Sequence, residues 1–410
     1  MRILLISKLN TRESYGGSNR AYYLGKYLSE KAEVFQLGVD CTGVDYCPSE
    51  STGSLSVRAF HHTIRRVMAH FHPDVVYSFE SRANLACWLL KRRGYDDPQF
   101  VYDFPSSPAF EWGTYFKSGS RTPESLYRWI RGLLIERIIT GDAVIFIAAG
   151  GFLHDMLLRT YGVSPDRVFT VPNGAPPAML DGGEYEVSES PYPKAGKKIA
   201  VMIGPRDDYT NVMAVEFLHK VAAELEDHQD TEIAILGGGP QLGDGPNVRY
   251  MGYVADINPY LDYADLCLLP YPKEAVCGGA RLKSFEYFAR KKIVLSTPEG
   301  TRGLERFRHL EHLYVCKDDP KVFAREMIRL LTDRERYAEL GHNAYRCVMD
   351  HHSWKGLAEE VYAILDQGKG QTGNGKRETG KWGNEEMGKG EGGKREIAKT
   401  GCLPQRHEEH

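Results

Sequence analysis

Short apolar runs alternate with amphipathic helical patterns along most of this sequence. The first run, Arg2–Ser7, is followed by a glycine pair, Gly16 and Gly17, and by a helical pattern that ends near Leu28. Runs of about four to eight apolar residues between helical patterns are typical of strands in a parallel sheet that helices cover on both faces. The sequence therefore predicts an α/β protein built from doubly wound sheets.

The chain is long enough for more than one domain. With 410 residues it can form two domains of ordinary size. A segment rich in Pro, Gly and charge, 176–198, is typical of a linker. We expect a first domain over residues 1–180, a second over 195–350, a helix over 351–366 and a disordered tail over 367–410. The tail is rich in glycine and charge, so it cannot bury enough apolar surface to offset the entropy lost on ordering.

Charge, cysteine content and hydropathy exclude several classes of protein. The formal net charge is −3, so no overall positive field favours nucleic acid as a partner. The eight cysteines include no CxxC pair, which is typical of reduced thiols in a cytoplasmic protein. The sequence opens with a strand pattern rather than a secretion signal, and its longest apolar run, 143–153, is too short to cross a bilayer. We expect a soluble, cytoplasmic protein.

The segment Pro272–Leu304 carries the strongest signal of a site. A glycine pair, Gly278 and Gly279, precedes a helical pattern there. Such a pair lets the backbone approach a ligand closely, and the helix start behind it offers unpaired N–H groups, which together favour a phosphate. Lys283 would neutralise phosphate charge, and Glu286 would accept hydrogen bonds from sugar hydroxyls. The alternative is an ordinary αβ unit whose lysine and glutamate form a solvated pair.

The same segment resembles the donor-site signature of retaining glycosyltransferases of family 4, which have the GT-B fold. One form of that signature reads G-G-x-R-x-K-x-x-E-x-x-A, then a strand, then T-x-x-G-x-x-G-L. The matching residues are Gly278, Gly279, Arg281, Lys283, Glu286, Ala289, Thr297, Gly300, Gly303 and Leu304. Many members carry a second glutamate eight residues before the one at Glu286, where this chain has Gly278. The resemblance implies two Rossmann-like domains that face each other across a cleft, with a C-terminal helix that crosses back to the first domain.

Four further positions are matched outside this segment. In the family a strand of the first domain often ends in D-x-H; Asp103 matches the aspartate, while Pro105 stands at the histidine position. Arg206 lies one residue away from the family's diphosphate-facing arginine. Gly238 belongs to a turn that resembles the family's G-x-G-P turn, and Val254 ends a V-x-x-x-G-x-V match near which the family contacts the base.

The resemblance implies that a sugar is transferred from a nucleotide-sugar donor to an acceptor hydroxyl, with retention of anomeric configuration. We expect catalytic roles for Asp103, Arg206, Lys283 and Glu286. We expect donor binding by Gly16, Gly17, Gly238, Val254, Gly278, Gly279 and Arg281. The sequence has no D-x-D triplet, which disfavours a donor metal held by paired carboxylates. No metal and no cofactor besides the nucleotide-diphosphate sugar is expected, so helix ends, lysine and arginine must meet the diphosphate charge.

Two other classes of function remain open. A nucleotide-sugar epimerase or a sugar phosphorylase would have the same fold, and would consume nucleotide sugar without an acceptor or depend on free phosphate. The second class is a non-catalytic partner subunit, because Gly278, Pro105 and the displaced Arg206 depart from the family pattern. The aromatic stretch after Phe104 leaves the carboxyl end of a predicted strand, so we interpret it as an irregular loop that faces the acceptor.

Two basic helical patterns in the predicted first domain favour a lipid-linked or otherwise membrane-borne acceptor. The first, His61–His72, combines arginines and histidines with apolar residues, and the second, Tyr127–Ile139, carries three arginines beside Trp129 and several apolar residues. Such helices can lie on anionic headgroups, which would place the enzyme at the inner face of a membrane. The alternative is that their apolar faces pack on the first sheet and that the acceptor is a soluble sugar.

Overall fold

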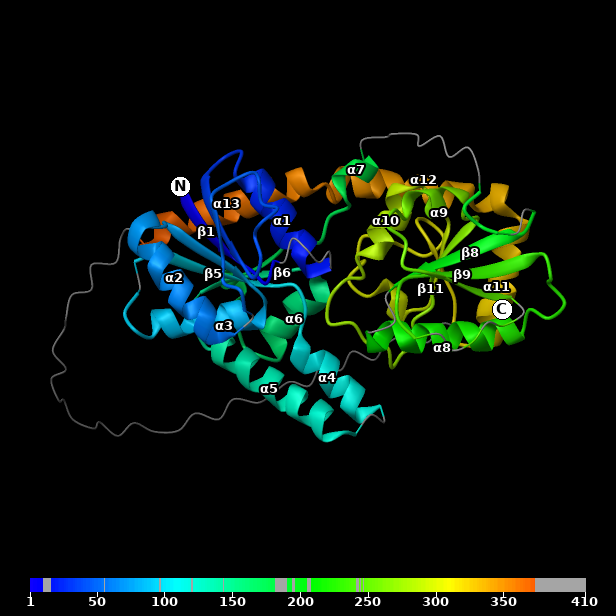
Figure 1. The fold of residues 1–410 in the computed structure, drawn as a ribbon, viewed down its shortest axis with the longest axis horizontal. Coiled ribbons are helices and arrows are strands. Elements are labelled where there is room, and N and C mark those ends of the chain that lie inside the picture. Colours follow the sequence, from blue (N-terminus) through cyan, green and yellow to red (C-terminus); the bar gives the residue numbers. More distant parts are fainter. Residues whose placement is uncertain are drawn as a thin grey trace, which may run out of the picture.

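The computed structural model describes residues 1–9, 16–54, 56–95, 97–118, 121–142, 144–180, 190–193, 196–204, 208–240, 243, 245 and 247–372. Within these residues the chain forms two α/β domains, each built on one parallel sheet (Figure 1). The prediction of two doubly wound domains is therefore confirmed.

The first domain contains a seven-stranded sheet in the order β3-β2-β1-β4-β5-β6-β7. Its strands are β1 (Arg2–Ile6), β2 (Glu33–Gly38), β3 (Ser49–Ser51), β4 (Val75–Phe79), β5 (Gln99–Phe104), β6 (Ile145–Ala148) and β7 (Val168–Thr170). Successive side chains of a strand point to opposite faces. Ile3 and Leu5 accordingly pack into one apolar cluster and Leu4 and Ile6 into another, so this sheet is buried on both faces.

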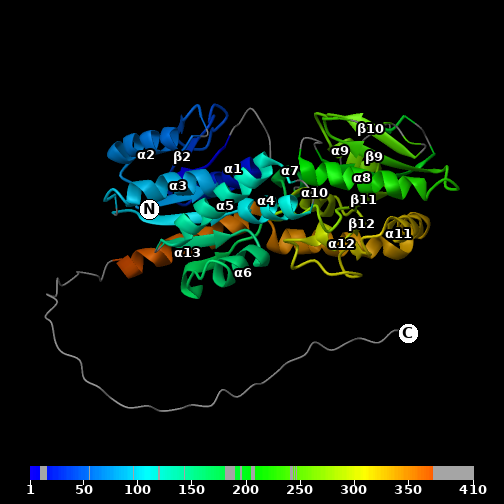
Figure 2. The ribbon, with the colours of Figure 1, turned by 90° about the horizontal axis from the view of Figure 1, so that it is seen from below.

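Helices cover both faces of the first sheet (Figure 2). One face is covered by α2 (Val57–Phe71), α3 (Glu80–Lys91) and α6 (Gly151–Arg159), and the other by α1 (Gly16–Leu28) and α13 (Trp354–Thr372). The apolar residues Ile64, Val67 and Phe71 of α2 are buried in this packing. The first basic helical pattern, His61–His72, lies in α2, and its apolar face packs on the sheet. This is the alternative that we gave to a membrane contact for that helix. Among the described helices, none has the combination of length and apolar character that a bilayer span requires.

The second domain contains a six-stranded sheet in the order β10-β9-β8-β11-β12-β13 around a single apolar core. Its strands are β8 (Lys198–Ile203), β9 (Thr231–Leu236), β10 (Val248–Gly252), β11 (Leu266–Leu269), β12 (Val294–Ser296) and β13 (Tyr314–Val315). Its helices are α8 (Tyr209–Ala223), α9 (Asn258–Tyr263), α10 (Lys283–Ala289), α11 (Pro320–Thr332) and α12 (Arg334–His351). Short helical turns lie at α7 (Pro177–Leu180), Pro165–Arg167 and Glu299–Thr301.

The chain returns to the first domain just after α12. His352 is buried and its ring lies 2.8 Å from the carbonyl oxygen of Asn173. Trp354 stacks on Tyr23 of α1, and Gly174 leaves the space for it, because a Cβ at that glycine would lie 2.7 Å from the indole. Helix α13 continues to Thr372, beyond the start we predicted for the tail; residues 373–410 lie outside the described part of the chain.

The aromatic stretch after Phe104 forms a helix, so our interpretation of it as an irregular loop was wrong. Ser107 caps α4 (Pro108–Lys117) by accepting a hydrogen bond from the Phe110 amide at 3.1 Å. Proline at the first helical position suits the helix start, because its fixed φ is already helical. Together α4 and α5 (Pro123–Thr140) form a helical pair that extends beside the second domain (Figure 1).

Candidate active site

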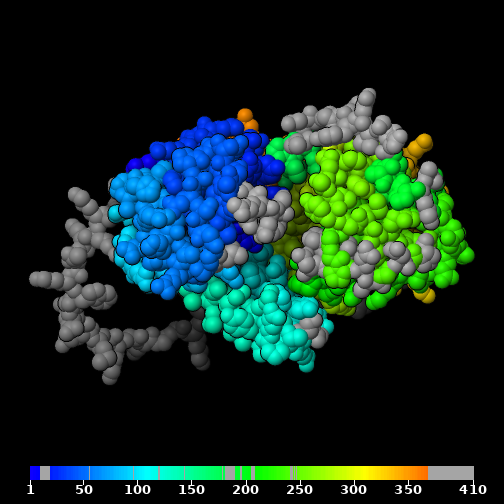
Figure 3. Space-filling view, viewed as in Figure 1, coloured from blue at the N-terminus to red at the C-terminus, as the bar shows by residue number. Residues whose placement is uncertain are grey.

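A cavity of about 370 Å³ lies between the two domains, which meet along the furrow seen in Figure 3. The segments that follow β1 and β4 contribute Lys8 and Glu80 to one wall, α1 contributes Arg20, and the second domain contributes Arg281 and Lys283. Ligands bind at the carboxyl ends of strands in doubly wound sheets. The described lining contains four cationic side chains and two carboxylates, which favours an anionic ligand. We call this space the cleft cavity.

Lys283, the first residue of α10, is held by three acceptors. Its Nζ donates to the Tyr271 hydroxyl at 2.7 Å, to Asn211 Oδ1 at 3.0 Å and to the carbonyl oxygen of Ile203. These match the three donors of an ammonium group. Gly204 leaves the space for this arrangement, since a Cβ there would lie 2.7 Å from Lys283 Nζ. The positive charge is therefore fixed at the carboxyl end of β8.

Glu286 lies one helical turn after Lys283, on the part of α10 near the first domain. Burial raises the pKa of its carboxyl group, and the nearby Lys283 charge acts in the opposite direction. The pKa of Tyr23 on α1 is also raised, first by its own burial and then by neighbours that include Glu286. Glu286 is thus a half-buried carboxyl group that lies near Lys283 of the second domain and Tyr23 of the first.

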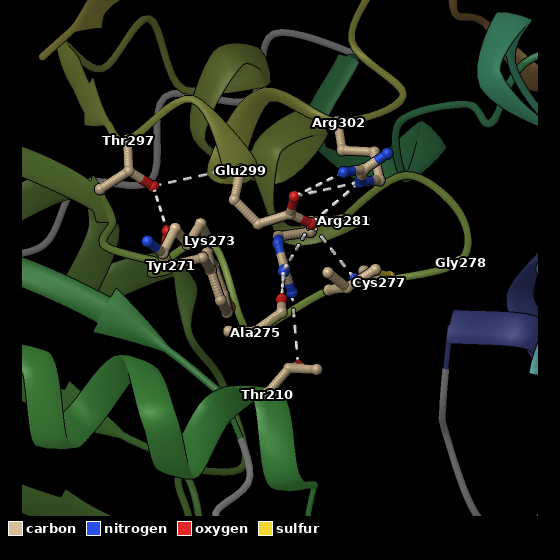
Figure 4. A network of polar contacts seen from close by, with 12 residues as sticks. Thr210, Tyr271, Lys273, Ala275, Cys277, Gly278, Arg281, Thr297, Glu299 and Arg302 are labelled. Atoms are coloured by element: carbon tan, nitrogen blue, oxygen red, sulfur yellow. Dashed lines mark hydrogen bonds and ion pairs between the residues drawn. The ribbon is translucent and has the colours of Figure 1, made fainter. Parts of the chain in front are cut away.

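The segment between β11 and α10 is held by the polar network drawn in Figure 4. The Arg281 guanidinium donates to the Ala275 carbonyl oxygen at 2.5 Å and is only 6% exposed. Glu299 accepts hydrogen bonds from the Cys277 amide at 3.3 Å and from Arg302 Nε at 2.9 Å. Arg281 also lies 3.8 Å from Glu299. In this structure Arg281 therefore shapes the segment, in addition to lining the cavity.

The glycine pair contacts backbone of the first domain. The Gly278 amide donates to Glu111 Oε1 at 2.8 Å. A Cβ at Gly278 would lie 2.7 Å from the Ser107 amide nitrogen, and one at Gly279 would lie 2.2 Å from the Pro105 carbonyl oxygen. No larger residue could occupy position 279 without moving the domains apart. The glycine pair was expected to let the backbone approach a ligand closely. In this structure the backbone of the first domain, rather than a ligand, lies close to the pair.

Helix α4 joins the two domains beside this contact. Trp112 and Tyr115 pack against Tyr209 of α8, with ring centres 6.0 and 4.4 Å apart. Burial raises the pKa of Glu111 to about 7, although the hydrogen bond from Gly278 acts in the opposite direction. No local sequence pattern indicates this contact, because its two partners are separated by 167 positions.

Asp103 is fully buried and holds Arg20. Its two carboxylate oxygens accept hydrogen bonds from Arg20 Nε and Nη2, each at 2.9 Å, and from the Tyr77 hydroxyl at 2.5 Å. Arg20 also donates to the carbonyl oxygens of Val171 and Pro172, just before the linker. In this arrangement Arg20 reaches the cleft cavity, and Asp103 acts by positioning it. Sequence reasoning missed Arg20, although it lies only three residues after Gly17.

The ion pair of Lys8 and Glu80 was also missed. Lys8 Nζ lies 3.1 Å from Glu80 Oε1, and both residues line the cleft cavity. Glu80 has a φ of 69°, a left-handed conformation that is strained for a residue with a side chain. Burial raises the pKa of Glu80 to about 7, and the pairing with Lys8 acts in the opposite direction. The sequence signal that could have identified Glu80 as a site residue is its position directly after the strand β4.

Of the predicted site residues that the structure describes, Asp103, Glu286, Gly278, Gly238 and Val254 are not among the described residues that line the cleft cavity. Gly16 and Gly17 are the first residues of α1. Gly238 follows β9 and Val254 follows β10, and neither lines the cavity. Arg206 lies outside the described residues. Asp208, which follows it, caps α8 by accepting hydrogen bonds from the amides of Thr210 and Asn211, so that helix start is already paired with a carboxylate.

Each of the two domains matches a family model of glycosyltransferases. Residues 197–333 match the family model of glycosyl transferases group 1, and residues 15–174 match that of the glycosyl transferase 4-like domain. No curated protein matches the sequence closely enough to count as a relative.

Solved structures of several proteins share the fold. Sucrose-phosphate synthase from Thermosynechococcus elongatus superposes with a TM-score of 0.72 at 17% identity, over 90% of this chain and 99% of its own. Trehalose 6-phosphate synthase from Burkholderia multivorans gives 0.68 at 11% identity, over 93% and 99%. Anabaena HepE in complex with UDP gives 0.63 at 12% identity, over 90% and 100%.

The two matched family models cover one domain each and together span most of the chain. The structural neighbours align over nearly their whole length, so the likeness includes both domains and their arrangement. The cleft cavity lies where the two matched regions meet. This chain therefore belongs to the two-domain glycosyltransferases of the GT-B fold.

Proposed function

We propose that this glycosyltransferase moves a sugar from a nucleotide-diphosphate donor to an acceptor hydroxyl with retention of anomeric configuration, and that it does so without a donor metal. The observation that carries the proposal is the cleft cavity, which is lined by Lys283 of the second domain and by Lys8 and Arg20 of the first domain. A diphosphate between them would be neutralised from both domains. Anabaena HepE is also known in complex with UDP and glucose, which supports a nucleotide sugar as the donor class.

The reaction needs stabilisation of the departing diphosphate more than it needs a nucleophile. When the leaving phosphate takes the acceptor proton on the same face of the sugar, the protein supplies charge and orientation. Lys283 is already oriented by Tyr271 and Asn211, so little reorganisation is required as charge develops. Glu286 would accept hydrogen bonds from the donor hydroxyls, and Asp103 would act through Arg20.

The decisive experiment incubates the full chain with a panel of nucleotide sugars and measures the released nucleoside diphosphate. Transferase activity requires release that rises with an added acceptor and a product whose anomeric configuration, read by NMR, equals that of the donor. Activity should persist in the presence of a chelator. Consumption of donor without acceptor would favour an epimerase, dependence on free phosphate a phosphorylase, and absence of turnover across the panel a partner subunit.

We further propose that the enzyme works in the cytoplasm and that α5 contacts the inner face of a membrane. Four apolar residues recur at every fourth position along one side of α5: Leu126, Ile130, Leu134 and Ile138. Leu134 is 58% exposed and Ile130 46% exposed. Arg131 and Arg137 each lie one helical turn from Leu134 beside this apolar stripe, an arrangement suited to anionic headgroups.

Vesicle sedimentation tests the membrane contact. The full chain should bind anionic vesicles more strongly than neutral ones at low salt, and Leu134→Gln should weaken that binding. Tyr253→Gln is the matched control, because Tyr253 is an exposed aromatic residue of the second domain at 83% exposure. Equal binding by the two variants and the unmodified protein would show that the stripe plays no part and would favour a soluble acceptor.

A further inference from the structure

A second cavity adjoins the cleft cavity on the first domain. Its volume is about 270 Å³, and it shares Lys8 and Glu80 with the cleft cavity. Helices α3 and α5, which lie side by side in Figures 1 and 2, form its walls. We call it the arginine groove, because Arg82 of α3 and Arg128 and Arg131 of α5 line it.

The charge of the arginine groove is strongly unbalanced. Its described lining contains four cationic side chains, the three arginines and Lys8, and a single carboxylate, that of Glu80. The lining also contains the apolar side chains of Phe60, Ala83 and Ile135. Low-dielectric walls strengthen the field of the charges around them, so the groove concentrates positive potential.

Two of the arginines are oriented by aromatic rings. The guanidinium of Arg128 lies 4.5 Å from the ring centre of Trp112 and also pairs with Glu124. That of Arg131 lies 5.4 Å from the ring centre of Tyr127, and Arg131 has no carboxylate partner among the described residues. Stacking leaves the edges of a guanidinium open to hydrogen bonding, which suits the recognition of phosphate oxygens.

The ion pair between the two cavities is built under strain. Glu80 adopts its left-handed backbone conformation at the point where β4 passes into α3. This conformation accompanies the placement of its carboxylate 3.1 Å from Lys8, at the junction of the two cavities. A sugar hydroxyl at this junction would meet both a hydrogen-bond acceptor and a donor.

We propose that the arginine groove binds a phosphate ester or diphosphate carried by the acceptor. The accepting sugar would extend from the groove across Lys8 and Glu80 into the cleft cavity, where the donor is bound. This inference rests on the proposed transferase function and names the chemical class of its acceptor: a phosphorylated sugar, either free or lipid-linked. The lipid-linked form would lay its chain along the exposed stripe of α5, which adjoins Arg131.

The first test is a calorimetric titration with inorganic pyrophosphate, which needs no turnover. The groove should bind the anion, and Arg131→Gln combined with Arg82→Gln should weaken this binding about tenfold through the loss of charge-assisted hydrogen bonds. Arg137→Gln is the matched control, since Arg137 is an exposed arginine of α5 that does not line the groove. Lys283→Ala separates the groove from the cleft cavity. The proposal would be overturned if pyrophosphate binding were lost only in Lys283→Ala, or if its affinity were unchanged in the groove variants.

The second test compares acceptors once an active donor is known. A phosphorylated sugar should have a KM about tenfold below that of the same neutral sugar, and the groove variants should abolish this difference without changing donor KM. If the groove variants lose the KM advantage of a soluble sugar phosphate, the natural acceptor is a free phosphorylated sugar. If they lose it only for a short-chain lipid diphosphate sugar, the natural acceptor is lipid-linked. Equal use of neutral and phosphorylated sugars would refute the inference. A chain that binds pyrophosphate in the groove but turns over no nucleotide sugar would refute the transferase function instead.

Discussion

The two walls of the cleft cavity are organised differently. In the second domain, Lys283 and Arg281 are held by neutral acceptors and by Glu299, so the wall is shaped before any ligand arrives. In the first domain, a strained Glu80 pairs with Lys8 beside a groove with an excess of positive charge. Groups that are held in place before binding favour one geometry of the ligand. An excess of positive charge, in contrast, is neutralised only when an anionic ligand binds. If the proposed function holds, the wall of the second domain, here called the donor wall, would orient the donor, and the wall of the first domain, the acceptor wall, would select the acceptor by charge.

The largest effect should come from removing the fixed charge of the donor wall. Lys283→Ala is expected to lower kcat/KM about 100-fold, because a preorganised cation no longer stabilises the leaving diphosphate. Lys283→Arg should be much less harmful, since it retains the charge. Release of nucleoside diphosphate is the measurement. Equal losses in the two variants would mean that shape, rather than charge, is what position 283 provides.

A smaller effect is expected at Glu286, which concerns the donor alone. Glu286→Ala should weaken donor binding or turnover at least about tenfold, through lost hydrogen bonds to a charged group, with little change in Tm. Glu216→Ala is the control, because Glu216 is exposed on α8. Unaltered donor kinetics would remove Glu286 from the site, and a collapsed fold would give it a structural role.

The contact between the walls can be broken by a single methyl group. Gly279→Ala would place a Cβ 2.2 Å from the Pro105 carbonyl oxygen, so the domains must separate. We expect donor KM to rise about fivefold, in line with the cost of overpacking, and the radius of gyration from solution scattering to increase. Gly245→Ala, whose Cβ would meet only Val248 at an ordinary 3.8 Å, should change neither quantity. A closed, fully active Gly279→Ala protein would contradict this geometry.

The smallest effect concerns pH. Burial raises the pKa of Glu111 to about 7 from an ordinary value of 4.5, so the folded state binds its proton more tightly than the unfolded state does. The stability associated with this group should therefore be greatest below pH 4.5 and decline as pH rises towards 7. Glu111→Gln should flatten that decline by roughly 1 kcal/mol, or a few degrees in Tm. Thermal unfolding at several pH values measures it; parallel curves for variant and unmodified protein would contradict the assignment.

The sequence could predict elements whose signals are local. The alternation of apolar runs and helical patterns predicted both sheets, and the spacing of Lys283 and Glu286 placed them on adjacent turns of one helix. The helix after Phe104 was missed although Ser107 and Pro108 form a recognisable start, because aromatic residues in this stretch obscured the periodicity.

Other features of the site depend on contacts that no local pattern contains. The hydrogen bond of Glu111 with Gly278 joins residues 167 positions apart. Arg20 pairs with Asp103, 83 positions away, so the carboxylate for which a catalytic role was predicted is buried and paired in this structure. The strain at Glu80 is a property of the backbone that its residue type does not indicate. Such features become visible only when the tertiary structure brings the partners together.

The return of α13 to the first domain has a consequence for how the chain is made. Val361 and Leu365 of this helix are fully buried against the first sheet, next to residues of β1 and β4. A ribosome synthesises those strands long before it synthesises the helix that covers them. The first domain therefore emerges with one apolar face of its sheet partly uncovered, and it must wait for the entire second domain before its core is complete. The domain that is synthesised first is therefore the one whose core is completed last.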